Sequence, residues 1–176
     1  MKVTKEQIKA LNPCRHGWER YLKNQEEDLL TLLLDANKSN PSDARWLFTR
    51  LMNKTQCMKI AVFSAREVLH IFEEKYPEDK RPRKAIEAVE TCLKDPSERN
   101  RELAADAAAA AYAASSASSA SSADAAAYAA AASYASSASS ASYAVYAAAV
   151  YAAADAAKKE LQEKIIKEAV RILETL

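Results

Sequence analysis

The densest group of side chains that could carry chemistry is a basic cluster near the middle of the chain. It comprises four cations and one aromatic ring, namely Lys80, Arg81, Arg83, Lys84 and Tyr76. Guanidinium groups form bidentate contacts with phosphate or carboxylate, and Pro82 restricts the local backbone, which lowers the ordering cost of binding. Cations at a helix start also oppose the positive end of its dipole. The cluster therefore indicates an anionic partner, carboxylates elsewhere in the same chain, or a solvated surface.

Nucleophilic and metal-binding residues are few and poorly placed for a reaction. His16 follows Cys14 by two positions, a spacing that puts the two side chains on different sides of a helix. A structural zinc site needs paired, closely spaced ligands, and His70 lies among glutamates on an expected polar stripe. A single glycine cannot build a phosphate-binding loop. We expect no catalytic residue, no metal site and no cofactor.

Composition limits the class of partner and the cellular location. Lys plus Arg number 25 against 24 for Asp plus Glu, so no overall field attracts DNA or an anionic membrane. The three cysteines, Cys14, Cys57 and Cys92, are odd in number and widely spaced, which is typical of reduced thiols in the cytoplasm. The first residues also lack the apolar run of a signal peptide. We expect a cytoplasmic protein whose cysteines contribute packing, not activity.

Residues 1–103 show the pattern of successive amphipathic helices. Thr4 and Gln7 form a capping-box motif. Prolines that follow Asn or Asp predict helix starts at Pro13, Pro41 and Pro96. Apolar spacing predicts helices at residues 26–35, 41–53, 55–76 and 82–94. The third of these is apolar around most of its circumference, so we expect it to be central.

The composition changes abruptly at residue 104, because 49 of the 54 residues from 104 to 157 are Ala, Ser or Tyr. Such a tract can be a disordered linker, but Ala is the best helix former and Gly and Pro are absent. A single helix from Pro96 to the C-terminus would be about 120 Å long, so it must fold back. We expect turns near residues 120–124 and 140–143 and a last helix over 155–173.

The uncharged stretch of this tract, residues 125–154, is long enough to cross a bilayer. It holds only two strongly apolar aliphatic residues, Val145 and Val150, among Ala, Ser and Tyr. Insertion into a membrane is driven by Leu, Ile, Phe and Val, so we expect no membrane span. Small side chains instead let helices approach closely, and their faces would also allow a homo-oligomer.

These patterns together predict an all-α fold, a compact multi-helix bundle that includes an Ala/Ser/Tyr-rich helical hairpin. We expect one helical domain over residues 1–176. Its expected parts are amphipathic helices at 1–103, Ala/Ser/Tyr-rich helices at 104–157 and a C-terminal amphipathic helix at 158–176.

Several motifs are shared with a known family. They are the start Met1–Tyr21 with Cys14, Gly17 and Trp18, the pairs around Trp46-Leu47 and Arg50-Leu51-Met52, the stretch 75–87, and Lys164-Ile165-Ile166. On these residues nearly the whole chain resembles the phage and bacterial putative immunity proteins with an immunity-type-five-like domain. The chain departs from the family pattern in the many serines of the Ala-rich tract. The resemblance implies a binding protein and carries over no catalytic residue.

The leading hypothesis is a non-catalytic phage or bacterial immunity or anti-defence protein that neutralises a protein toxin or defence effector by binding it. Exposed charged turns of the N-terminal helices would make the contact. A second hypothesis is a sponge that sequesters a small anionic signalling nucleotide, with Arg and Lys on phosphates and Tyr rings on bases. An enzyme and a purely structural helical module are the remaining interpretations.

Overall fold

The computed structural model describes residues 1–118 and 155–175, and these ranges are built from α-helices. The helices are α1 (Lys5–Ala10), α2 (Arg15–Asn24), α3 (Leu29–Ser39), α4 (Pro41–Leu51), α5 (Lys54–Lys75), α6 (Arg81–Lys94), α7 (Glu98–Ser118) and α10 (Asp155–Glu174). Within these ranges no strand forms, although Lys2 and Asp28 make an isolated antiparallel bridge. More than two thirds of the described residues are helical. The predicted all-α fold is confirmed.

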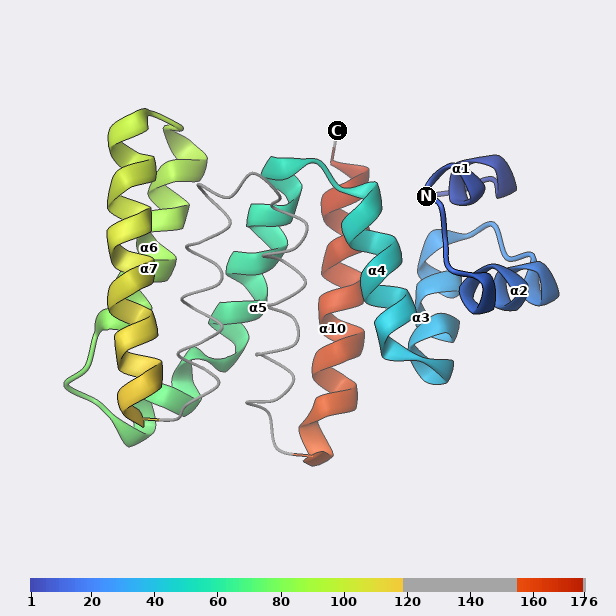
Figure 1. Ribbon diagram of the computed structural model, residues 1–176. Coiled ribbons are helices and arrows are strands. Elements are labelled where there is room, and N and C mark those ends of the chain that lie inside the picture. Colours follow the sequence, from blue (N-terminus) through green and yellow to red (C-terminus); the bar gives the residue numbers. More distant parts are fainter. Residues whose placement is uncertain (119–154, 176) are drawn as a thin grey trace.

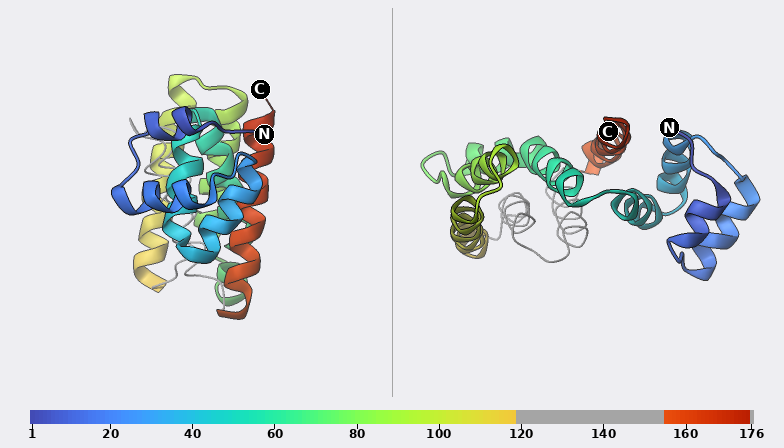
Figure 2. Two further views of the ribbon diagram at one scale, coloured as in Figure 1. Left: turned by 90° about the vertical axis from the view of Figure 1, so that its right-hand side faces the viewer. Right: turned by 90° about the horizontal axis from the view of Figure 1, so that it is seen from above.

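The helices stand side by side in an extended row, with α6 and α7 at one end and α1 and α2 at the other (Figure 1). The view from above in Figure 2 shows the same order along the row. The C-terminal helix α10 packs against α5 on one side and against α3 and α4 on the other. It therefore joins the N-terminal helices to the α5–α6–α7 part of the bundle.

Capping side chains set the starts of several helices. The Thr4 hydroxyl accepts a hydrogen bond from the Gln7 amide, and the Gln7 side chain accepts one from the Thr4 amide, as the capping-box motif predicted. Asn53 and Gln56 form a second capping box at the start of α5. Pro41 is the first residue of α4, as predicted.

Two of the three proline-based helix starts are wrong by two residues. The helix expected at Pro13 begins at Arg15, because Asn12 adopts a positive φ of 56° and the Cys14 thiol caps the helix by accepting a hydrogen bond from the Gly17 amide. The helix expected at Pro96 begins at Glu98. In both cases a residue after the proline, not the one before it, provides the cap.

The other predicted helix boundaries are partly confirmed and partly wrong, and two predicted turns cannot be compared. The helix expected over residues 26–35 spans Leu29–Ser39 instead, and the Asp28 carboxylate caps its start by accepting a hydrogen bond from the Thr31 amide. The last helix, expected over 155–173, spans Asp155–Glu174. The turns expected near 120–124 and 140–143 lie outside the described residues.

A hydrophobic core runs through the whole row, from Ile8 in α1 to Ala108 in α7. The expected central position of α5 is confirmed, since α5 contributes eleven buried residues. One of them is Gln56, whose amide donates a hydrogen bond to the Ile172 carbonyl at 3.1 Å and so connects α5 to α10. No helix in the described ranges has the length and apolar character that a bilayer crossing requires.

Candidate functional site

The basic cluster lies at residues 75–84, which comprise the last residue of α5, the connecting loop and the first turn of α6; we call this segment the α5–α6 turn. It lies at one end of the row, at the lower left in Figure 1. Tyr76 follows the last residue of α5, and its ring packs against Phe72 with ring centroids 5.0 Å apart. The Lys75 ammonium lies 5.4 Å from the Tyr76 ring centroid. Pro82 is buried in the first turn of α6. The turn is thus held by packing on both sides.

Arg83 forms a bidentate ion pair with Glu73 and so connects the two helices that flank the turn. Its Nε donates to Oε1 at 2.6 Å and its Nη2 to Oε2 at 2.5 Å. The hydrogen bond from Arg83 lowers the pKa of the Glu73 carboxyl below its ordinary value. Further along the same pair of helices, Arg66 of α5 pairs with Glu90 of α6 in the same geometry.

Arg81 is paired within the turn itself. Its Nη2 donates to Asp79 Oδ2 at 2.6 Å, and its backbone amide donates to Asp79 Oδ1 at 3.1 Å. The Asp79 carboxylate therefore satisfies a helix-start amide as well as the guanidinium, and these bonds lower its pKa. Cations at the start of α6 are compatible with the helix dipole because Asp79 and Glu73 supply compensating negative charge.

The lysines of the cluster differ from the arginines. Lys80 and Lys84 are exposed, and neither side chain makes a hydrogen bond or ion pair with any residue that the structure describes. Arg81 and Arg83 keep side-chain exposures of 43% and 41% despite their pairing. The structure thus brings all five predicted residues onto one turn, two of them held by carboxylates, one packed and two open to solvent.

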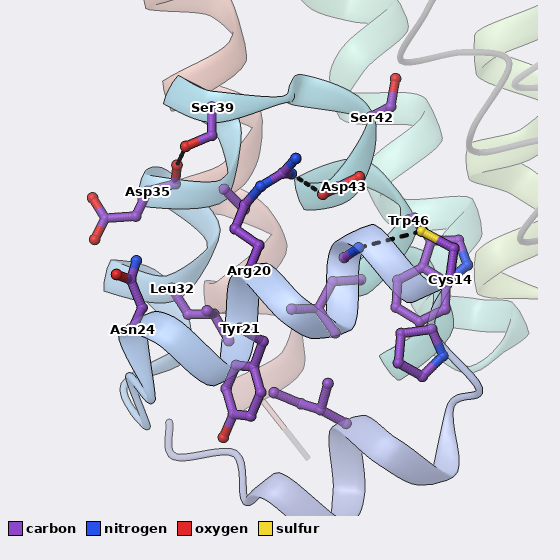
Figure 3. A pocket seen from close by; sticks show the side chains of 15 residues that line it. Cys14, Arg20, Tyr21, Asn24, Leu32, Asp35, Ser39, Ser42, Asp43 and Trp46 are labelled. Carbon is purple, nitrogen blue, oxygen red and sulfur yellow. Dashed lines mark hydrogen bonds and ion pairs between the residues drawn. The ribbon is translucent and has the colours of Figure 1, made fainter.

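A cavity of about 260 Å³ lies among α1, α2, α3 and α4, near the opposite end of the row (Figure 3). Most of its wall is apolar. Side chains that form the apolar part include Ile8, Tyr21, Leu32, Trp46 and Leu47. They come from all four helices, so the cavity depends on tertiary packing and on no single motif.

One side of this cavity carries an ion pair. Figure 3 shows Arg20 reaching from α2 toward Asp43 of α4, where its Nη1 donates to Oδ2. The other oxygen of Asp43 accepts a hydrogen bond from the Asn40 side chain at 2.8 Å. Both oxygens of the carboxylate are therefore occupied, and the two charges compensate each other at the wall.

Comparison with known protein families identifies the family of the chain. The model of the Imm-5 like putative immunity protein family matches residues 48–174. The chain belongs to this family. No curated protein and no solved structure gave a match.

The Imm-5-like match separates the two candidate regions. It includes the whole α5–α6 turn, and it begins at Phe48, after the last residue that lines the cavity. The turn is thus part of the family region, whereas the cavity precedes it. Nothing in the sequence predicted the cavity, since its wall residues are scattered from Ile8 to Leu47 without a common spacing. The one available signal was Gly17, the single glycine of the chain.

The cysteines and His70 differ in burial. Cys14 is exposed at the start of α2, whereas Cys57 and Cys92 are buried thiols. His70 is exposed on α5. Among the described residues no group of three or more His, Cys, Asp or Glu is arranged to hold a metal ion. The expected absence of a metal and a cofactor stays a prediction.

Proposed function

We propose that the protein is a non-catalytic immunity or anti-defence protein that acts in the cytoplasm and neutralises a protein toxin or defence effector by binding it. Membership of the Imm-5-like family over residues 48–174 is the observation that supports this proposal. An immunity protein acts by occupying its partner, so it needs a complementary surface and no catalytic group.

We further propose the α5–α6 turn as part of the binding surface. Lys80 and Lys84 are exposed there and make no ion pair with any described residue, and the pairing of Arg81 with Asp79 and of Arg83 with Glu73 holds the segment that carries them. Groups held before binding lose less conformational entropy when a partner arrives. An acidic surface on the partner complements this turn, and charge complementarity of this kind raises the rate of association and fixes orientation.

The proposal is tested by purifying the tagged protein from its native host and measuring the intact complex by native mass spectrometry. We expect a bound mass of protein size at a fixed stoichiometry. The captured partner, expressed alone, should be toxic or active in defence, and co-expression of this protein should remove that effect. A bound mass of nucleotide size would instead favour the nucleotide sponge.

The same purified components distinguish binding from catalysis. If the protein acts by occupancy, full neutralisation requires at least one equivalent for each partner molecule. Neutralisation of a large excess of partner by a small amount of this protein would contradict a non-catalytic mechanism.

A further inference from the structure

The cavity among α1–α4 is partly open to solvent, since Cys14, Asn24 and Ser42 of its wall are exposed. At about 260 Å³ the cavity approaches the lower end of known small-molecule sites, which begin at roughly 300 Å³. Its mixed wall, mostly apolar with a few polar groups on one side, is also typical of such sites. The space therefore suits a compact ring system.

The single glycine of the chain forms part of this wall. Gly17 lies in the first turn of α2 without a positive φ, so its backbone does not require glycine. A Cβ at Gly17 would lie 3.5 Å from Cys14 Sγ and 3.8 Å from Asp43 Oδ2, which are ordinary contacts. Alanine would fit and favours a helix by up to about 1 kcal/mol. The sequence thus lacks a side chain at a position where one would reduce the cavity.

The charges at the wall favour an uncharged ligand. Arg20 is paired with Asp43, whose second oxygen is bound by Asn40. The remaining acidic residue, Asp35, pairs with Lys38 at 3.1 Å. An ion entering the cavity would find each charge already compensated and would have to break an existing pair to gain one.

Aromatic side chains favour a flat ring as the occupant. Trp46 and Tyr21 both line the cavity, and Tyr21 is itself stacked on Trp18 at 5.7 Å between ring centroids. Rings pack against rings in offset or edge-on geometry and gain stability beyond area burial. Asn24 offers a side-chain amide at the same cavity, and the Ser42 hydroxyl, which accepts a hydrogen bond from Arg45, keeps its O–H as a donor. We propose that this cavity binds a small, uncharged aromatic molecule that carries a hydrogen-bonding group.

This proposal is independent of toxin binding and can be tested on the purified protein alone. The probe is indole, an uncharged bicyclic ring with one N–H donor, titrated into ¹⁵N-labelled protein. The chain has two tryptophans, so the indole N–H signals give an internal comparison. We expect a saturable shift of the Trp46 signal at submillimolar to millimolar indole, with a smaller shift for Trp18, which does not line the cavity.

Matched variants locate the binding. Gly17→Ala adds one methyl group and should keep indole binding within about threefold. Gly17→Leu fills the cavity and should weaken binding at least tenfold. If Gly17→Leu does not fold, Ala36→Phe fills the same cavity from α3. Circular dichroism confirms that each variant is folded before titration.

Three outcomes would overturn the proposal. The first is the absence of any saturable shift with indole. The second is unchanged indole binding in a folded, cavity-filled variant, because the probe would then bind elsewhere. The third is tighter binding of the charged analogues tryptamine or indole-3-acetate than of indole, because the site would then select an ion.

Discussion

The two ends of the helical row use their charged groups differently. At the α5–α6 turn, Arg81 bonds to Asp79 and Arg83 bonds to Glu73. The two lysines of the turn are exposed to solvent. At the α1–α4 end, an ion pair between Arg20 and Asp43 borders a cavity of about 260 Å³. Arginines that are clustered in the sequence can thus be paired within the protein, and a cavity can form where the sequence shows no motif.

The largest expected effect is a loss of stability, which we compare at two leucines of similar burial. Leu69 of α5 and Leu32 of α3 are 4% and 6% exposed, but only Leu32 lines the cavity. We expect Leu69→Ala to lower the free energy of unfolding by about 3–4 kcal/mol and Leu32→Ala by about 2–3 kcal/mol, because a side chain beside a void makes fewer contacts. Urea denaturation measures both. Equal losses, or a larger loss for Leu32→Ala, would mean that the N-terminal helices pack together in solution without the cavity.

A smaller effect is expected for the ion pair that flanks the turn. Arg83→Glu places two carboxylates side by side and should lower the melting temperature by a few degrees. The exchanged double variant Arg83→Glu with Glu73→Arg restores opposite charges and should recover most of that loss. Thermal unfolding followed by circular dichroism tests the pair of variants. A double variant no more stable than Arg83→Glu would show that the pair does not stabilise the turn.

Acid should weaken the α5–α6 pair of helices gradually. Hydrogen bonds from Arg83, Arg66 and Arg81 lower the pKa values of Glu73, Glu90 and Asp79 in the folded protein, whereas the ordinary values are 4.5 for Glu and 3.8 for Asp. A lowered folded-state pKa contributes stability that is present above the ordinary pKa and lost as pH falls through the folded value. We therefore expect the free energy of unfolding to decline from about pH 5 downward.

Urea denaturation at a series of pH values measures this decline. The control is the double variant Glu73→Gln with Glu90→Gln, which removes two of the titrating groups and should flatten the dependence. An identical pH dependence in the wild type and the control would contradict the assignment to these carboxyls.

The helices could be predicted from the sequence where local rules decide. The Thr4–Gln7 capping box and the start at Pro41 were correct because the cap and the first turn are adjacent in the chain. The starts at Pro13 and Pro96 were wrong because a residue after each proline caps the helix instead of the residue before it. Asn12 turns the chain with a positive φ, and Cys14 then caps α2.

The basic cluster could be found from the sequence, but its ion pairs could not. Arg83 and Glu73 are ten residues apart and meet only because α5 and α6 pack antiparallel across the turn. The cavity could not be predicted from the sequence, because it forms only when four helices are in their final positions. Gly17 belongs to the motif shared at the start of the chain, but its place in the cavity wall depends on the tertiary packing that brings Asp43 close to it.

We propose that this protein neutralises its partner by binding it through the α5–α6 turn. The most direct test is calorimetric titration of the captured partner with wild-type protein, with Lys80→Glu/Lys84→Glu and with the matched control Lys5→Glu/Lys9→Glu, which reverses two exposed lysines of the same spacing in α1. We predict one-to-one binding that weakens at least tenfold, and more steeply at low salt, in the turn variant alone. Equal affinity for all three proteins, or no heat of binding with the wild type, would contradict the account.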